Sequence, residues 1–354
     1  MACWSCYFGH DTMSNNSTTE IRVAVLVGSE HIERWRWNAL AALATEPDIR
    51  ITHVVVNEGS SSSSGKSGVA TFVRDAFRRF REYPLWSLVG VGRILSSVPV
   101  YSQPLHIDAI PEISSAERLS CSPITVDELW NELPEETIDR LEGVDVIVRF
   151  GFGMLKGRVL TTPTYGVLSY HPGDIRVYRG QPGGFWEFLN SESQMGVTVQ
   201  RLNETLDGGE IAALESIDTS DLNTWQEIKV RAYTTAERML VPAVRTVTSG
   251  DVKQPDQIGE LYRIPKGWDV IRYLAKNTQG RVRNFTDTVR RSTGKWIQPG
   301  TVALLILIGL LNAGLHPLFS HHYIIPIHLE QILGLVLLVG GFMYLLGMDR
   351  HHTV

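Results

Sequence analysis

The stretch Gly166-Val-Leu-Ser-Tyr-His-Pro-Gly-Asp174 decides the fold expected of this chain. It is a short apolar strand that ends at a histidine. A second apolar run, residues 196–202, is followed by the turn Leu206-Asp-Gly-Gly-Glu-Ile211. An open α/β sheet brings residues that are distant in sequence together at the carboxyl ends of its strands. We therefore expect His171 and Asp207 to meet at one edge of such a sheet.

Other apolar runs predict the rest of this sheet. Residues 21–27 (IRVAVLV) have the continuous hydrophobicity of a buried parallel strand, and a helix is predicted through residues 35–43. Further strands are predicted at residues 51–56, 144–150, 167–170 and 211–217, and further helices at 69–83, 126–141 and 225–248. Residues 85–122 have little pattern and are interpreted as an insertion.

The histidine, the aspartate and the frame around them resemble the catalytic domain of the 10-formyltetrahydrofolate-dependent formyltransferases. This group includes glycinamide ribonucleotide, methionyl-tRNA and sugar N-formyltransferases. The frame comprises Tyr178-Arg-Gly180, Gly196-Val-Thr198 and Gly208-Gly-Glu-Ile211. The resemblance covers residues 21–248, most specifically 144–217. It implies an α/β fold with an open, twisted, mostly parallel Rossmann-like sheet, and an enzyme that moves a formyl group from 10-formyltetrahydrofolate to a primary amine.

Formyl transfer needs a donor for the developing oxyanion, a proton carrier and a group that fixes that carrier. The resemblance gives the last two roles to His171 and Asp207, and a histidine pKa of about 6.5 suits a proton carrier. Where the family has an asparagine, two residues before the histidine, this chain has Ser169. Three interpretations follow: a working enzyme with a serine donor, which we favour, a slower enzyme, or a relative that binds without turnover.

The resemblance also implies residues that contact the substrates. The edge of the folate pocket is predicted at Phe150, Gly151, Phe152, Gly153, Leu155 and Asp207. Arg179 is expected to shape its turn and, with Gly180, is predicted to bind substrate; a structural ion pair is the alternative for Arg179. The spacing of the glycines in residues 151–157 also resembles that of a dinucleotide-binding fingerprint. However, the third glycine comes one position late and the motif is not on the first βα unit, which argues against that reading.

Several other classes of site and partner are disfavoured. Residues 60–67 have the spacing of a P-loop but begin with serine, which indicates a solvated serine-rich loop, with ATP binding as the alternative. Cys3, Cys6 and His10 are too few ligands for a closed zinc site, so no metal is expected. The net charge of −5 argues against a nucleic-acid partner.

The carboxyl-terminal part of the sequence has a different character. Residues 301–319 and 332–348 contain no Lys, Arg, Asp or Glu and approach the roughly 17–25 residues of a membrane-spanning helix. We predict a disordered leader at 1–20, a catalytic domain at 21–250, a basic juxtamembrane linker at 251–298 that contacts membrane lipids, and a transmembrane hairpin at 299–349. A buried hairpin of a soluble domain is the alternative. The positive-inside rule then places the catalytic domain on the cytoplasmic side of the membrane.

These features also suggest the acceptor. Methionyl-tRNA formyltransferases carry a further β-barrel after the catalytic domain, whereas this chain has a basic segment and two apolar stretches there. An anchored enzyme suggests a substrate made at the membrane, and we expect a nucleotide- or lipid-linked amino sugar of cell-envelope glycan synthesis. The alternatives are a non-catalytic folate- or substrate-binding membrane protein with a degenerate fold, and a 10-formyltetrahydrofolate hydrolase.

Overall fold

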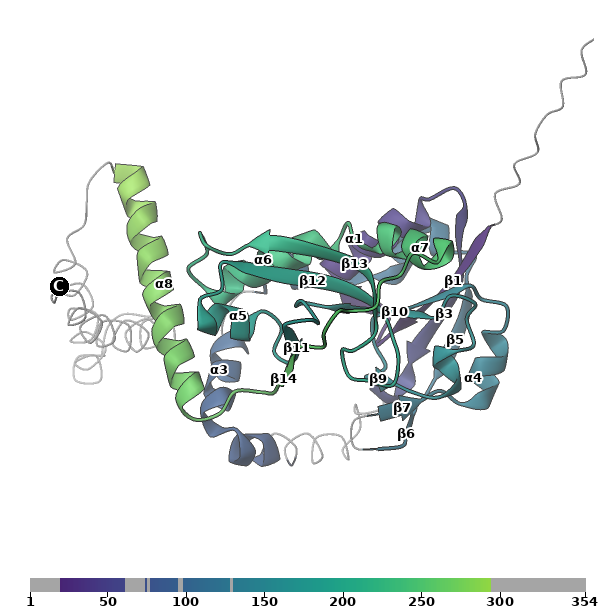
Figure 1. The fold of residues 1–354 in the computed structure, drawn as a ribbon, viewed down its shortest axis with the longest axis horizontal. Helices are drawn as coiled ribbons and strands as arrows, with labels where there is room; N and C mark the ends of the chain where they lie inside the picture. Colours follow the sequence, from purple (N-terminus) through teal and green to yellow (C-terminus); the bar gives the residue numbers. More distant parts are fainter. Residues whose placement is uncertain (1–19, 61–73, 75–76, 95–97, 128–129, 294–354) are drawn as a thin grey trace, which may run out of the picture.

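A seven-stranded sheet forms the centre of the protein (Figure 1). The computed structural model describes residues 20–60, 74, 77–94, 98–127 and 130–293. In spatial order the strands are β13 (Glu210–Asp218), β12 (Gln194–Arg201), β10 (Val167–His171), β8 (Val146–Arg149), β1 (Ile21–Val27), β3 (Ile49–Asn57) and β5 (Glu117–Cys121). The run from β10 to β5 is parallel, and β12 is antiparallel to both of its neighbours. The predicted α/β fold with a mostly parallel sheet is confirmed.

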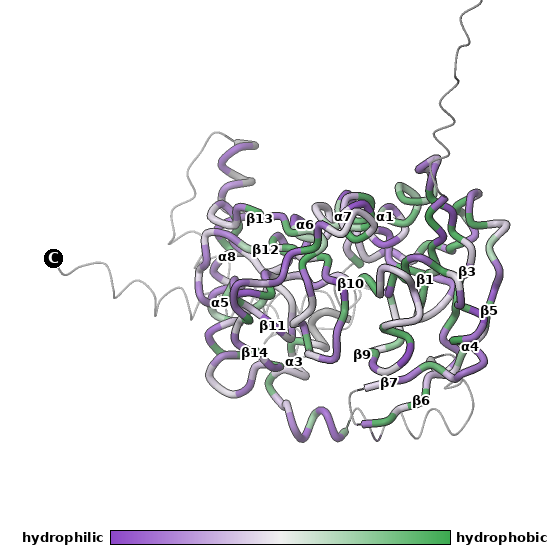
Figure 2. Tube along the Cα trace, turned by 45° about the vertical axis from the view of Figure 1, so that its right-hand side comes forward, coloured by the Kyte–Doolittle hydropathy of each residue, from purple (hydrophilic) through white to green (hydrophobic). Residues whose placement is uncertain are grey.

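Helices cover both faces of the sheet because alternate strand residues point to opposite sides. One face packs under α1 (Arg34–Ala44), α6 (Trp225–Ala236) and α7 (Leu240–Ser249) and forms the larger core cluster. The other face packs against α4 (Glu135–Arg140) and the chain around it, and forms a smaller cluster. In Figure 2 the hydrophobic stretches of the trace include segments of the sheet strands.

Short elements complete the described part of the chain. Two-stranded pairs are β2 (His31–Glu33) with β4 (Pro104–His106) and β11 (Tyr178–Gly180) with β14 (Glu260–Tyr262). A three-stranded group joins β6 (Ile124–Thr125), β7 (Trp130–Glu132) and β9 (Met154–Leu155). Further α-helices are α3 (Pro84–Ile94), α5 (Phe185–Asn190) and α8 (Trp268–Thr293), and the described residues 77–82 are helical as well. Single 3₁₀ turns occupy Glu58–Ser60, Val100–Ser102, Ile107–Ala109, Pro111–Ile113 and Arg158–Leu160.

Three sequence-based assignments are wrong in detail. The helix predicted at 126–141 is β7 followed by the short α4, because residues 130–131 pair with β9 and Pro134 stands at the start of the helix. The helix predicted at 225–248 is divided into α6 and α7. The stretch 85–122 is not a simple insertion, since it supplies α3 and the edge strand β5, which pairs with β3.

The segment predicted as a linker is folded over much of its length. Strand β14 pairs with β11, and α8 lays Val270 and Tyr273 into the larger core cluster. Asn277 accepts a hydrogen bond from the backbone of Trp225 at 3.2 Å. The prediction of a plain linker is therefore corrected for residues 260–277.

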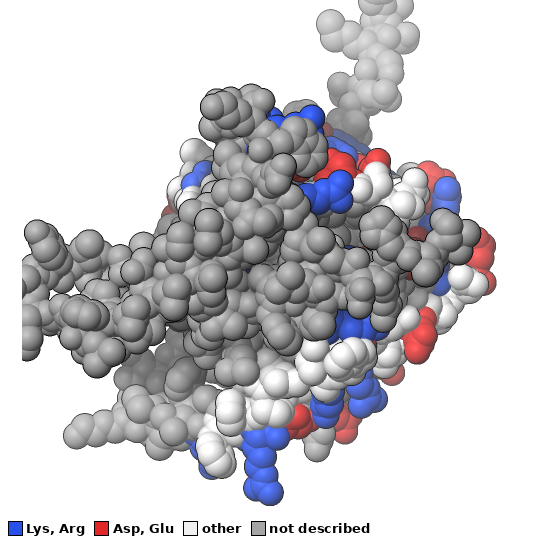
Figure 3. Space-filling model, turned by 90° about the vertical axis from the view of Figure 1, so that its left-hand side faces the viewer, with Lys and Arg blue, Asp and Glu red and all other residues white. Residues whose placement is uncertain are grey.

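Other predicted segments lie outside the described residues: the leader 1–19, the loop 61–68 and the hairpin 299–349. Among the helices that are described, none has the length and apolar character of a membrane span. On the face in Figure 3, the described surface carries side chains of both charge signs.

Candidate active site

Strand β10 carries the first two predicted catalytic residues on one face of the sheet. Ser169 and His171 are two positions apart and therefore point the same way. Across the antiparallel pair with β12, Ser169 lies opposite Gln200 and His171 opposite Thr198. On the parallel side, Ser169 lies beside Arg149 of β8. A row of polar side chains thus crosses three neighbouring strands in register.

The structure brings His171 and Asp207 together. Nδ1 of His171 lies 3.5 Å from Oδ2 of Asp207, and Nε2 of the ring lies 2.9 Å from the carbonyl oxygen of Tyr178. The histidine side chain is 6% exposed and the aspartate side chain 18%. Both partners of the ring are hydrogen-bond acceptors, an environment that favours the doubly protonated imidazolium.

The backbone of the turn after β12 holds Asp207 in place. Its φ of 45° lies in the left-handed region, which aspartate tolerates better than most residues. Oδ2 accepts the N–H of Gly180 at 2.9 Å, and Oδ1 accepts the side-chain amide of Gln200 at 3.2 Å. The carboxylate is therefore oriented by two donors besides the imidazole.

Electrostatics within this pair favour the charged forms. Burial works against ionisation of both groups, but their mutual contact outweighs it. The pKa of His171 is raised above its ordinary value by Asp207 and the Tyr178 carbonyl. The pKa of Asp207 is lowered by His171 together with the donors Gly180 and Gln200.

Glu187 is a further acid near the histidine, to which the sequence analysis assigned no role. It lies on α5 and is 3% exposed. Burial raises the pKa of this carboxyl to about 7, and the charge of His171 acts in the opposite direction. Glu187 therefore changes charge near neutral pH.

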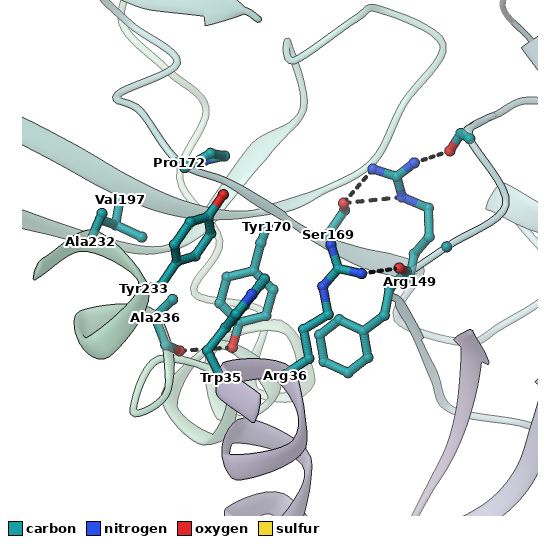
Figure 4. A pocket seen from close by; sticks show the side chains of 13 residues that line it. Trp35, Arg36, Arg149, Ser169, Tyr170, Pro172, Val197, Ala232, Tyr233 and Ala236 are labelled. Carbon is teal, nitrogen blue, oxygen red and sulfur yellow. Dashed lines mark hydrogen bonds between the residues drawn. The ribbon is translucent and has the colours of Figure 1, made fainter. Parts of the chain in front are cut away.

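A cavity of about 210 Å³ opens beside Ser169. It lies between the amino-terminal end of α1, the carboxyl ends of β8 and β10, and α6 (Figure 4). Its walls carry aromatic rings and two arginines. The lining residues are Trp35, Arg36, Arg149, Phe150, Gly151, Gly153, Ser169, Tyr170, Pro172, Val197, Ala232, Tyr233 and Ala236. His171 is not one of them, so the proton carrier adjoins this cavity through its neighbours on β10.

The predicted binding residues divide into two groups. Phe150, Gly151 and Gly153 line the cavity, and their assignment to the folate pocket stays a prediction. Phe152 and Leu155 are each 2% exposed and pack in the smaller core cluster, so their side chains do not face the cavity. The prediction that the loop at residues 150–155 forms the edge of the folate pocket stays a prediction.

The two residues predicted to contact substrate support the aspartate turn. Arg179 donates to the carbonyl oxygens of Gly259 and Leu206, at 2.7 and 2.9 Å, as expected of a residue that shapes the turn. Its contact with substrate stays a prediction, and among the described residues it forms no ion pair. Gly180 donates its N–H to Asp207, and its φ of 87° requires glycine.

Arg149 is the principal residue that the sequence analysis missed. It donates to Ser169 Oγ from Nε at 3.1 Å and from Nη2 at 2.8 Å, and also to the carbonyl of Gly153. Burial lowers the pKa of this guanidinium to about 10, and Asp207 opposes that shift. The signal was a single arginine at the end of the strand VDVIVRF, where a buried strand is expected to be apolar.

Metal ligands do not gather in the described part of the chain, where no group of three or more His, Cys, Asp or Glu side chains is arranged to hold an ion. Cys3, Cys6 and His10 lie outside the described residues.

Comparison with known proteins gives a family for this region. Residues 127–244 match the family model described as formyl transferase. The methionyl-tRNA formyltransferase of Thermotoga maritima is 27% identical over 126 residues, which are 35% of this chain and 40% of that protein. The enzyme of the same name from Clostridium botulinum is 24% identical over 159 residues, 41% of this chain and 52% of that protein. The chain thus spans about half or less of the length of these relatives.

Solved structures give weaker likenesses. Glycinamide ribonucleotide transformylase 1 from Symbiobacterium toebii has 16% identity and a TM-score of 0.42, over 69% of this chain and 95% of that one. A 4-N formyltransferase from Francisella tularensis has 12% identity and a TM-score of 0.43, over 72% and 86%. These values do not bear on what this chain acts upon.

Proposed function

We propose that the protein transfers a formyl group from 10-formyltetrahydrofolate to a primary amine, because residues 127–244 match the family model described as formyl transferase. The observation that carries this proposal is the contact between His171 Nδ1 and Asp207 Oδ2, 3.5 Å apart at the end of β10. The contact supplies a fixed proton carrier whose neighbours on β10, Ser169 and Tyr170, line the cavity.

The proposed reaction exchanges one C–N bond for another. The amine nitrogen attacks the formyl carbon, and negative charge develops on the formyl oxygen. Collapse of the tetrahedral centre breaks the bond to the donor nitrogen, which takes the proton that the amine loses. The Ser169 hydroxyl faces the developing oxyanion as a donor. His171 carries the proton at Nε2, whose partner in this structure is the Tyr178 carbonyl, while Asp207 holds Nδ1.

The cavity is proposed to bind the acceptor. Its 210 Å³ is below the roughly 300–1,000 Å³ typical of pockets for drug-sized ligands, so it suits a single ring better than a whole folate. Aromatic rings in the wall, among them Trp35 and Tyr233, suit the apolar face of a sugar. Arg36 and Arg149 add positive charge, which suits an acceptor with a phosphate group.

We propose an amino sugar, nucleotide- or lipid-linked, as this acceptor, and attachment to the membrane through the predicted hairpin 299–349, with the catalytic domain on the cytoplasmic side. The support for attachment is the two stretches without charged residues, 301–319 and 332–348, and the basic segment before them. Recovery of the full-length protein in carbonate-washed membranes, with the catalytic domain open to protease only from the cytoplasmic side, is the expected result. Recovery of the protein in the soluble fraction would contradict it.

The activity is tested with the full chain, 10-formyltetrahydrofolate and a panel of amines. The panel contains nucleotide-linked amino sugars, lipid-linked amino sugars, amino sugars without phosphate and glycinamide ribonucleotide. We expect release of tetrahydrofolate in step with an N-formyl product, fastest with the phosphate-bearing amino sugars. Tetrahydrofolate release without any formylated amine would instead indicate hydrolysis, and folate binding without release would indicate a non-catalytic protein.

A further inference from the structure

We propose that Arg149 is a positioning residue which makes the Ser169 hydroxyl the oxyanion donor of formyl transfer. The inference rests on the proposed function and adds a residue that the resemblance does not assign. It explains how this chain can work with serine at the position of the family's asparagine.

The contact with Arg149 restricts the direction of the Ser169 hydroxyl hydrogen. Arg149 donates to Ser169 Oγ twice, from Nε at 3.1 Å and from Nη2 at 2.8 Å (Figure 4). A hydroxyl oxygen has two lone pairs and one hydrogen, so two accepted bonds occupy both lone pairs. Among the described residues, Ser169 donates to no acceptor. Its O–H is therefore available as a donor and is directed away from the guanidinium.

The arginine itself is held in place. Its neighbour across the parallel pair β8–β10 is Ser169, so the two residues are in register. The guanidinium also donates to the carbonyl of Gly153, which ties it to the loop after β8. Both Arg149 and Ser169 line the cavity. The lowered pKa of Arg149, about 10, still leaves the group charged at neutral pH.

These contacts remove the weakness of a serine donor. An asparagine amide presents a fixed N–H, whereas a free hydroxyl rotates and loses directional preference. Here the Arg149 guanidinium fixes the rotation of the Ser169 hydroxyl and polarises its O–H bond. A hydrogen bond accepted from a charged group strengthens the hydrogen bond that the hydroxyl then donates. The positive charge also lies beside the place where negative charge develops.

A purely structural role for Arg149 is the competing explanation, since the same side chain connects β8, β10 and the Gly153 loop. A double-mutant cycle separates the two. We expect Ser169→Ala and Arg149→Met each to lower kcat by about 10²-fold, with KM for both substrates changed by no more than about twofold. Because the two residues act as one unit, the double variant is expected to be no slower than the slower single variant.

Rescue by asparagine is the sharper test. An asparagine brings its own N–H and does not need the arginine. Ser169→Asn introduced into the Arg149→Met protein is therefore expected to raise kcat at least about tenfold over Arg149→Met alone. If Arg149 had only a structural role, Ser169→Asn would not raise kcat in the Arg149→Met protein. Arg158→Met is the matched control: this exposed arginine pairs with Glu135 near the surface, and kcat is expected to be unchanged.

The outcomes separate the inference from the function. Three results would overturn the positioning role alone while the wild type still transfers formyl groups. Folded Arg149→Met could keep the wild-type kcat, the losses in the double-mutant cycle could multiply, or Ser169→Asn could fail to rescue Arg149→Met. Should Arg149→Met not fold, Arg149→Lys keeps a cation but cannot make the two-pronged contact, and full kcat in that variant overturns the role equally. Absence of formyl transfer in the wild type overturns the proposed function, and the inference with it.

Discussion

Gly180 donates its backbone N–H to Oδ2 of Asp207 at 2.9 Å, the same oxygen that faces His171. The aspartate is therefore fixed by a turn that is 27 residues away in sequence. Strand β11 ends at Gly180 and is itself held by pairing with β14. The geometry of the proposed proton carrier thus depends on the segment after residue 250 as well as on the central sheet.

Gly180→Ala tests this dependence. A Cβ at this position would lie 2.1 Å from the carbonyl oxygen of Tyr262, and φ is 87°. We expect a loss of at least about 2 kcal/mol in the free energy of unfolding and a strongly reduced kcat, because the backbone must shift and carries the N–H of residue 180 away from Asp207. Denaturant unfolding and the transfer assay measure both. Gly250→Ala is the control, since its φ is 81° but its Cβ would meet open space. Equal effects of the two substitutions would contradict the account.

Asp207→Asn is expected to shift the pH profile. The aspartate raises the pKa of His171, so the wild-type acid limb of kcat/KM, which reports deprotonation of the base, lies above pH 6.5. Removing the negative charge lowers the pKa of the histidine, and the acid limb moves to lower pH while the plateau rate falls. Asparagine tolerates the left-handed φ of this position, so the fold is retained. Asp221→Asn, a change in an exposed surface pair, is expected to leave the profile in place.

The free energy of unfolding is expected to depend on pH through the ionisation of Glu187. Its pKa is about 7 in the folded protein against 4.5 as the ordinary value, so the unfolded chain releases this proton first as the pH rises. The carboxyl therefore destabilises the fold progressively from pH 4.5 to 7, by a total of about 3 kcal/mol. Glu187→Gln is expected to raise the melting temperature at pH 8 and to have little effect at pH 4.5. A gain that is the same at both pH values would contradict this assignment.

Arg36→Met tests the cavity as the acceptor site. The side chain is one-third exposed and donates to the Phe150 carbonyl at 2.8 Å, with no contact to Ser169. We expect KM for a phosphate-bearing amino sugar to rise about tenfold or more, with kcat and KM for the folate donor changed little. Unchanged KM for the amine, with raised KM for the folate, would assign the cavity to the donor instead.

The sequence allowed a prediction of the fold where its pattern was simple. The apolar runs of β1, β8 and β10 indicated buried parallel strands, and turn residues brought His171 and Asp207 to one edge. Strand β5 (ERLSC) was missed because an edge strand with alternating polar residues carries little hydrophobic signal. Residues 130–132 were assigned to a helix because so short a strand, of which two residues pair with the distant β9, has no local signature.

The site was predictable only where a resemblance supplied the roles. The contact of Arg149 with Ser169 depends on the register of β8 and β10, and register between non-adjacent segments is not visible in local pattern. Arg179 was expected to shape its turn, and its bonds to the carbonyls of Leu206 and Gly259 agree with that expectation. The identity of these two acceptors, which are distant in sequence, could not be predicted from local pattern.

The most direct test is the rate of formyl transfer by His171→Ala, beside His53→Ala as its matched control. His53 also faces a carboxylate at 3.5 Å, Glu117, but on β3, away from the cavity. The account predicts that N-formyl product falls by about 10²–10⁴-fold in His171→Ala and is unchanged in His53→Ala. Full transfer activity in a folded His171→Ala protein would contradict it.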